Sequence, residues 1–315
     1  MESIGGYFSL ELPLREEFHR DAIRLNSGRN CFEYILRVRK YDKVYIPYYT
    51  CEVILEPLKK LNINYEFYRV DINLEIKDRI MLKENEGLLY TNYFGLKQRY
   101  VEQLAERIGS RLIVDNTQAF YAKRIKGIDS FYTCRKYFGV ADGAYLYCNM
   151  RLDGDIEQGV SYDKMVHLLK RIDLSAEQGY ADFRNADDSL DNNPIRAMSK
   201  LTHRMMQSID YDVAANKRRD NFQILHTALG PGNHLNLPLE KDAVPLVYPY
   251  LTSLTGLREK LIEKRVFVAC YWPNVLDWTT NDDIEYHLAF QTLPLPIDQR
   301  YGTEEMDRII ETIKQ

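Results

Sequence analysis

Short apolar runs alternate with segments of helical periodicity over the first half of the chain. The apolar runs are rich in Val, Ile, Tyr and Phe and predict strands over residues 43–47, 64–69, 87–94, 111–115, 130–133 and 144–148. Helical periodicity predicts helices over residues 30–37, 50–61 and 98–108, the last of them ended by Gly109. Strands joined by crossover helices build a mostly parallel sheet, so the pattern indicates the α/β class.

The pattern changes after residue 150, where the sequence becomes polar and helix-periodic. Residues 182–193 contain almost no apolar side chains, which predicts an exposed loop. A long helix is expected from residue 212 towards Gly230, followed by apolar runs at residues 244–247 and 266–271 and helices at residues 257–264 and 304–314. We therefore predict a large domain over residues 1–210, including an N-terminal arm, and a small α+β domain over residues 211–315.

Composition and charge exclude several classes of protein. The 315 residues are 45% hydrophobic and 28% charged, which is enough apolar material for a packed core and unlike a disordered chain. The formal net charge is −4 and no long block of one sign occurs, so nucleic acid is not an expected partner.

The spacing of the cysteines and histidines indicates whether the protein binds a metal and in which cellular compartment it lies. The five cysteines are widely separated and never form a C-x-x-C pair, and the six histidines lack the spacing of metal ligands, so neither disulfides nor a metal site are expected. The chain opens without a basic segment followed by an apolar one, and no apolar run reaches the roughly 20 residues of a membrane span. We expect a cytoplasmic protein with no membrane partner.

Two residues stand out as candidates for chemistry. Asp115 ends an apolar strand, where ligands bind in open α/β sheets, and Lys136 follows the next strand between Cys134 and two aromatic residues. Partial burial would lower the pKa of the lysine and make its neutral amine a nucleophile. A buried carboxylate and a nucleophilic lysine are what pyridoxal 5'-phosphate (PLP) requires, because the lysine forms a Schiff base and the carboxylate keeps the pyridine nitrogen protonated.

Structural explanations compete with this interpretation. An aspartate at the end of a strand is more often a helix cap or a loop hydrogen-bonding group, and a single lysine is nearly always a solvated surface charge. Spacing alone favours these explanations over a cofactor site.

Five motifs, taken in order, narrow the choice. They are N-S-G-R at residues 26–29, I-P-Y-Y-T at 46–50, N-Y-F-G at 92–95, D-N-T-Q-A at 115–119 and F-Y-T-C-R-K-Y-F-G-V-A-D-G at 131–143. Together they resemble the DegT/DnrJ/StrS-type aminotransferases, which are PLP enzymes of the aspartate aminotransferase fold (fold type I) that typically act on nucleotide-linked keto sugars. The resemblance is weaker at residues 218–222 and 293–301.

The resemblance implies specific roles around the cofactor ring. Lys136 matches the Schiff-base lysine, and Asp115 matches the partner of the pyridinium nitrogen. Gln118 matches a residue that contacts the face or the 3-hydroxyl of the ring. Asn92 would reach the ring 3-oxygen, although a turn asparagine before an aromatic pair is an equally good explanation of this residue.

The resemblance also implies a phosphate site at residues 26–29. Ser27, Gly28 and Arg29 match the phosphate-binding turn, and a Ser-Gly turn that opens a helix does present free backbone N–H groups to an anion. Thr133 could add a hydroxyl to the same phosphate. The alternatives are an ordinary N-cap for Ser27 and an ordinary strand residue for Thr133.

One departure from the family pattern concerns the cofactor ring. The family usually has an aromatic residue after the threonine that matches Thr50, stacked on the ring, whereas this chain has Cys51. Tyr49 or Tyr93 is the expected substitute.

These observations lead to a functional prediction with open alternatives. The chain is expected to be a PLP-dependent aminotransferase that uses a small amino donor and a carbonyl acceptor such as a keto sugar. A lyase, dehydratase or aldolase of the same fold is the first alternative, and an inert or regulatory relative is the second, although both Lys136 and Asp115 are retained. A homodimer is expected, with Tyr7 and nearby aromatic residues of the arm reaching the partner's cofactor.

Overall fold

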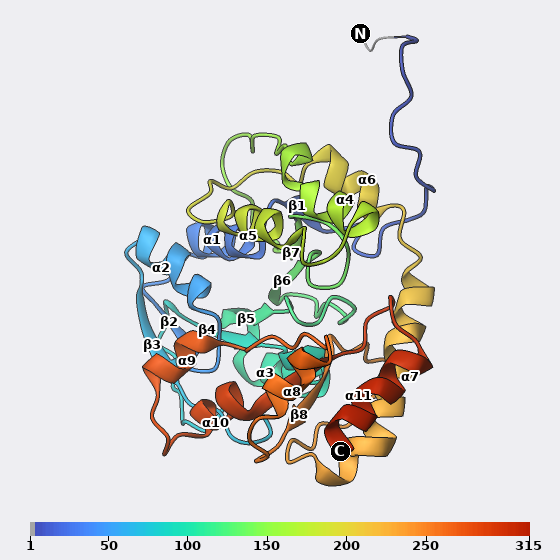
Figure 1. Ribbon diagram of the computed structural model, residues 1–315. Coiled ribbons are helices and arrows are strands. Elements are labelled where there is room, and N and C mark those ends of the chain that lie inside the picture. The colour runs from blue at the N-terminus through green and yellow to red at the C-terminus, as the bar shows by residue number, and fades with distance from the viewer. Residues whose placement is uncertain (1–3) are drawn as a thin grey trace.

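The core of the computed structural model, which describes residues 4–315, is a seven-stranded sheet (Figure 1). The strands are β1 (Ile23–Leu25), β2 (Lys43–Pro47), β3 (Asn64–Tyr68), β4 (Glu86–Thr91), β5 (Leu112–Asp115), β6 (Asp129–Thr133) and β7 (Ala144–Tyr147). They lie in the order β1-β7-β6-β5-β4-β2-β3. Neighbours from β3 to β6 pair in parallel, whereas β7 is antiparallel to both β6 and β1. The predicted α/β class with a mostly parallel central sheet is therefore confirmed.

Helices cover both faces of this sheet. They are α1 (Gly28–Arg39), α2 (Leu55–Lys60), α3 (Gln98–Ile108), α4 (Val166–Asp173), α5 (Tyr180–Asp188), α6 (Lys200–Met206), α7 (Tyr211–Leu229), α8 (Leu257–Glu263), α9 (Pro273–Trp278), α10 (Ile284–Gln291) and α11 (Thr303–Lys314). Figure 1 shows α4 to α6 near β1 at one end of the sheet and α8 to α10 near the other end.

Side chains along each strand point alternately to the two faces of the sheet, and each face contributes to a separate apolar core. In β4, Leu89 points to the core that α1 and α2 cover, while Leu88 and Tyr90 point to the opposite core. The same alternation puts Ile113 of β5 on the first side and Val114 on the second. Burial on both faces explains why these strands read as continuous apolar runs in the sequence.

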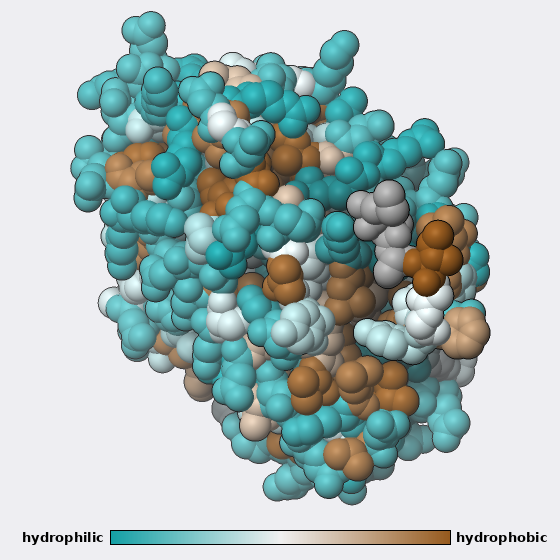
Figure 2. All heavy atoms as spheres, turned by 90° about the horizontal axis from the view of Figure 1, so that it is seen from above, coloured by the Kyte–Doolittle hydropathy of each residue, from teal (hydrophilic) through white to brown (hydrophobic). Residues whose placement is uncertain are grey.

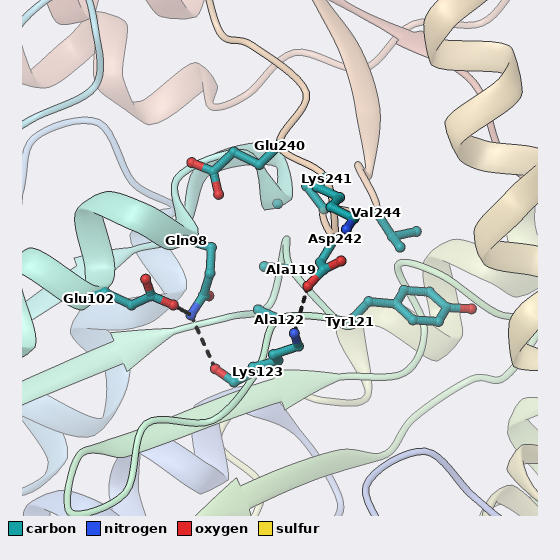
Figure 3. Close-up of a pocket in the computed structure, with 12 residues that line it drawn as sticks. Gln98, Glu102, Ala119, Tyr121, Ala122, Lys123, Glu240, Lys241, Asp242 and Val244 are labelled. Atoms are coloured by element: carbon teal, nitrogen blue, oxygen red, sulfur yellow. Dashed lines mark hydrogen bonds and ion pairs between the residues drawn. The ribbon is translucent and has the colours of Figure 1, made fainter.

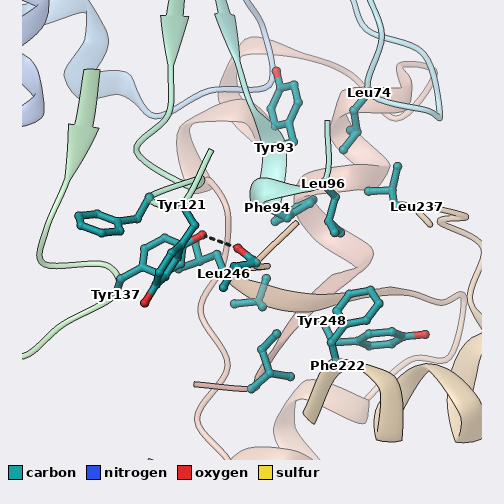
Figure 4. Packing of buried hydrophobic residues seen from close by; sticks show 14 of the residues in the cluster. Leu74, Tyr93, Phe94, Leu96, Tyr121, Tyr137, Phe222, Leu237, Leu246 and Tyr248 are labelled. Carbon is teal, nitrogen blue, oxygen red and sulfur yellow. Dashed lines mark hydrogen bonds between the residues drawn. The ribbon is translucent and has the colours of Figure 1, made fainter. Parts of the chain in front are cut away.

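A smaller antiparallel sheet lies in the C-terminal part of the chain. It consists of β8 (Val247–Leu251) and β9 (Thr292–Pro296), with α7 and α8 nearby. Its side chains share the second core with the large sheet, and Figure 4 shows Tyr248 packed against Phe222, with Leu246 between this pair and Tyr137. The α+β character of this part agrees with the sequence, while the boundary at residue 210 stays a prediction.

The predicted loop over residues 182–193 is wrong, because α5 covers most of it. Ala186 is the one buried residue of this helix, so its polar composition reflects exposure and not the lack of regular structure. Ion pairs hold it in place: Lys170 of α4 donates to Asp182 at 2.6 Å, and Arg135 pairs with Asp187.

Other boundaries also differ from the predictions. The run expected at residues 244–247 forms its strand later, as β8, and the run at 266–271 forms none. β9 was missed because its two prolines argue against a strand. The strand expected over residues 87–94 ends at Thr91, since Phe94 has a φ of 58° within a 3₁₀ turn. The helix expected over residues 50–61 splits into a 3₁₀ turn and α2.

The N-terminal segment extends away from the body of the molecule (Figure 1). Tyr7 and Phe8 are almost completely exposed. Over residues 4–315, every helix is too short or too polar to cross a lipid bilayer.

Candidate active site

The carboxyl ends of β5 and β6 meet the first turn of α1. Asp115 ends β5 and pairs with Phe131 of β6. A Cβ on Gly28, the first residue of α1, would lie 3.2 Å from Cγ2 of Thr117. The amine of Lys136 donates to Oγ1 of the same threonine at 3.1 Å. Gly28, Asp115 and Lys136 are thus brought together around Thr117, a residue that sequence reasoning missed.

Asp115 is a buried carboxyl group at this junction. Its Oδ1 accepts a hydrogen bond from the backbone N–H of Thr117 at 2.8 Å. Burial raises the pKa of Asp115 above its ordinary value, and the charge of Lys136 and the bonds from Thr117 oppose that rise. The charged form of Asp115 is therefore stable only with a cation nearby.

Lys136 lies in the turn that follows β6. Its side chain is accessible to solvent, yet burial of the amine lowers its pKa from the ordinary value, while Asp115 and Cys51 act to raise it. The exposed fraction and the lowered pKa are compatible, because the exposed fraction averages over the whole side chain, whereas the pKa depends on the burial of Nζ. The amine is therefore open to solvent on one side only. A lysine in this setting presents more of its neutral, nucleophilic amine than a solvated lysine does at the same pH.

The first turn of α1 has the properties of an anion site. Ser27 caps the helix: its Oγ accepts from the N–H of Asn30 at 3.2 Å and donates to Oδ1 of Asn30 at 2.6 Å. The predicted N-cap role is therefore confirmed, and it leaves the amides of Gly28 and Arg29 without an acceptor in the helix. These amides and the helix dipole favour a bound phosphate.

Arg29 has carboxylate partners within the chain. Its guanidinium donates to Glu56 at 2.7 Å and also pairs with Asp191. Its positive charge is compensated by these two groups, so its backbone N–H is the better candidate for contact with an anion.

Gln118 combines a structural bond with a free donor. Its Oε1 accepts from the N–H of Phe94 at 2.9 Å, and the side chain is fully buried. Within the described residues, its Nε2 has no hydrogen-bond partner. A buried N–H group without a partner is costly, and a polar atom of a ligand would satisfy it.

Asn92 follows β4 and Thr133 ends β6, the two strands on either side of β5. The amide of Asn92 donates to Oδ1 of Asn116 at 3.0 Å, and its Oδ1 accepts from the N–H of Lys97 at 3.1 Å. Asn92 therefore ties the two loops together, as a turn asparagine would. Thr133 is the buried last residue of β6. Contact of either residue with a cofactor stays a prediction.

The expected aromatic substitutes are fully buried. The rings of Tyr49 and Tyr93 stack on each other with centroids 5.5 Å apart, and Trp272 packs edge-on against Tyr49 at 5.1 Å. Neither tyrosine has an open face for a ligand. Half-buried Cys51 lies close enough to Lys136 for their charges to interact.

A cavity of about 210 Å³ lies beside residues 119–123 of the loop after Asp115 (Figure 3). Gln98 and Glu102 of α3 line one wall, and an ion pair of 2.7 Å between Lys123 and Asp242 lies at its edge. Lys136 and Asp115 are not among its lining residues, so this cavity is separate from the candidate site.

The residues around Thr117 fit PLP on structural grounds. The site offers a buried carboxyl for a ring nitrogen, an amine with a lowered pKa, a buried donor without a partner at Gln118, and a free helix N-terminus for a phosphate.

The sequence matches no protein-family model and no curated protein. The structure resembles solved aminotransferases. DesV from S. venezuelae has a TM-score of 0.64 and 15% identity over 93% of this chain and 84% of that chain. A DegT DnrJ EryC1 StrS aminotransferase from Brucella abortus has a TM-score of 0.62 and 15% identity over 93% and 85%. The sugar aminotransferase CalS13 from Micromonospora echinospora has a TM-score of 0.63 and 11% identity over 94% and 87%.

These similarities confirm the fold that the motifs predicted, the fold of the DegT-type aminotransferases. Structures with the same fold also include Spr1654 from Streptococcus pneumoniae in its PLP form and NtdA from Bacillus subtilis with bound PMP.

Proposed function

We propose that this protein is a PLP-dependent aminotransferase that transfers an amino group from a small donor to a carbonyl acceptor, with a keto sugar or a related compound as acceptor. The observation that carries the proposal is the junction where Lys136, Asp115 and the first turn of α1 meet around Thr117. The choice of a sugar rests on the names of two structures that share the fold, the sugar aminotransferases Spr1654 and CalS13.

Each residue has a separate task in this proposal. Lys136 binds the cofactor and then acts as the general base that moves a proton at its Nζ, a role that suits an amine with a lowered pKa. Thr117 orients that amine through the 3.1 Å bond. Asp115 holds a proton on the ring nitrogen, and the cofactor, when bound, supplies an electron sink for the substrate carbanion.

Binding of the phosphate and of the ring is assigned to the surrounding groups. The backbone N–H groups of Gly28 and Arg29 would hold the phosphate, with Ser27 fixing the turn and Thr133 adding a hydroxyl. The free Nε2 of Gln118 would donate to the ring, and Asn92 would hold the loop in which Gln118 lies.

The protein is further proposed to work as a homodimer. None of the residues of α4 is buried, although the helix and its flanks carry large apolar side chains. The exposed ones are Val160, Tyr162, Val166, Leu169, Ile172, Leu174 and Tyr180. Figure 2 looks down on the molecule from above Figure 1 and shows brown patches among hydrophilic groups. An apolar surface of this kind is typical of an interface between subunits.

The test of the proposal is covalent trapping. The purified protein is mixed with PLP, reduced with borohydride and digested, and the pyridoxyl mass is located by mass spectrometry. We expect it on Lys136, with loss of the adduct in Lys136→Ala and full retention in the control Lys123→Ala. A pyridoxyl mass on another lysine would contradict the site.

The reaction is tested with a panel of amino acids. An aminotransferase converts the donor to its keto acid and retains the amino group on the protein until an acceptor arrives. Release of ammonia or cleavage of a carbon–carbon bond would instead identify a lyase, dehydratase or aldolase, and a trapped adduct without any turnover would identify an inert relative.

A further inference from the structure

Arg218 of α7 is the largest side chain that is completely enclosed by the protein, with 1% of its surface exposed. Its hydrogen bonds go to uncharged groups. Nε donates to Oε1 of Gln299 at 3.0 Å, Nη1 donates to the carbonyl of Leu246 at 2.9 Å, and Nη2 donates to the carbonyl of Tyr137 at 3.2 Å. Burial lowers the pKa of Arg218, so keeping a cation here costs free energy. A lysine or an apolar residue could not make these three bonds together.

Tyr137 is held at three points. Its carbonyl accepts from Arg218 and also from Nε2 of Gln299 at 2.8 Å. Its ring lies 4.5 Å from the guanidinium carbon of Arg218, within the range of cation–π contact. Its hydroxyl donates to the carbonyl of Gln118 at 2.7 Å. Figure 4 shows the ring within the buried cluster, beside Tyr121 and Leu246.

The three contacts join parts of the chain that bear on the candidate site. Tyr137 directly follows Lys136, and Gln118 directly follows Thr117, the acceptor of the Lys136 amine. Arg218 and Gln299 belong to the C-terminal part of the chain. The position of Lys136 against Thr117 is therefore linked to the packing of α7 and of the segment after β9.

We propose that Arg218, together with Gln299, is a positioning residue that fixes Lys136 beside Thr117 and Asp115 by holding Tyr137 from the C-terminal part of the chain. This inference rests on the proposed function of Lys136. A planar guanidinium suits the task, since its donors reach Leu246 and Tyr137 at once while its face covers the tyrosine ring.

The test measures the ionisation of the Lys136 amine in the full-length protein without added PLP. An amine-reactive reagent is applied over a range of pH, and the labelled peptide is quantified by mass spectrometry. The midpoint of the pH dependence reports the pKa of Lys136 and does not depend on how easily the reagent enters. We expect the midpoint of the parent protein to lie below the ordinary lysine value of about 10.4.

Two variants remove the hold on Tyr137 in different ways. Arg218→Met removes the hydrogen bonds of the guanidinium together with the cation, whereas Gln299→Ala removes the second donor to Tyr137 and the acceptor of Arg218 Nε but keeps the cation. Both are expected to move the midpoint for Lys136 upwards, with labelling at pH 8 falling about tenfold for each unit of the shift. Arg218→Lys should recover only part of the effect. Arg219→Met, at the next position of α7, is the control and should leave the midpoint unchanged.

The outcomes separate the inference from its alternatives. Circular dichroism identifies which variants fold, and Gln299→Ala decides if Arg218→Met does not. A parental midpoint in every folded variant would overturn the inference and leave Arg218 with a purely structural role. Absence of a pyridoxyl adduct on Lys136 of the parent protein would reject the proposed function, while the labelling result would still stand.

Discussion

A methyl group added at Gly28 would contact Thr117, the residue at the centre of the candidate site. A Cβ there lies 3.2 Å from Cγ2 of Thr117 and 3.8 Å from the ring of Phe131. Carbon atoms normally approach to about 3.5–4.0 Å, so Gly28→Ala requires Thr117 to move by a few tenths of an ångström. The backbone of Gly28 does not need glycine for its own conformation, since its φ is not positive. The substitution therefore tests contact and not backbone strain.

The expected magnitudes follow from these distances. The overlap costs about 1–3 kcal/mol, and the higher helix propensity of alanine returns up to about 1 kcal/mol, so the free energy of unfolding should fall by about 0–3 kcal/mol. The bond from Lys136 to Thr117, now 3.1 Å, would lengthen towards the limit of hydrogen bonding. Loss of that bond, with a methyl group beside the amide that is proposed to hold the phosphate, should weaken PLP binding by about tenfold or more.

The assay pairs urea unfolding with titration of PLP followed by absorbance, and uses Gly139→Ala as a matched control. Gly139 lies three residues after Lys136, but a Cβ there would meet its nearest neighbour only at 3.9 Å. We expect parental binding in the control and weakened binding in Gly28→Ala, which the urea unfolding should show to be still folded under the conditions of the titration. Parental affinity in both variants would refute the assignment of Gly28 to the phosphate site.

Three further predictions address the acid, the base and the assembly. Asp115→Asn should keep the covalent adduct but slow transamination roughly 100-fold, because the ring nitrogen loses its anionic partner; a parental rate would remove Asp115 from this role. The stability of Lys136→Met relative to the parent should be most favourable at neutral pH. This relative stability should decline as the pH rises towards about 10. The reason is that the pKa of Lys136 is lowered in the folded state, so folding is penalised only while the lysine is charged. Urea unfolding at several pH values would show a constant difference between the two proteins if this is wrong. Leu169→Glu with Ile172→Glu should weaken a dimer seen by light scattering, and a monomeric parent with active bound cofactor would contradict the dimer.

The parts of the fold that the sequence predicted well have strong local signals. The helix expected over residues 98–108 has those bounds as α3, because Gly109, with a φ of 65°, ends it as a glycine can. The strand that carries Asp115 was found because burial on both faces makes it almost continuously apolar, and the strand that ends at Thr133 was found from its aromatic residues.

The missed elements depend on contacts between distant residues. Nothing local marks residues 180–188 as a helix, since the ion pair to Arg135 forms only in the folded chain. The prolines of β9 are tolerated because the small sheet has only two strands, so β9 lies at its edge.

Contacts between distant residues also decide which parts of the candidate site the sequence could predict. Asp115 and Lys136 could be proposed from residue type and motif, but Thr117 could not, because its importance comes from the turn that brings it to the lysine. The burial of Tyr49 depends on Trp272, which is far away in the sequence. In the sequence, Arg218 belongs only to the weaker part of the resemblance at residues 218–222. Its bond to the carbonyl of Tyr137 forms in the folded chain and could not be predicted.

The pairing of β1 with β7 has a consequence for how the chain reaches its native state. Ile23 lies opposite Leu146, so this edge of the sheet cannot close on the ribosome until the whole large sheet has been synthesised. Contacts between residues so distant in sequence slow folding, since the intervening chain must be ordered first. The carbonyl of Tyr137 gains its last donor only after Gln299, 162 residues further along the chain, has been synthesised. A nascent chain therefore already contains Lys136 long before that lysine is held in place.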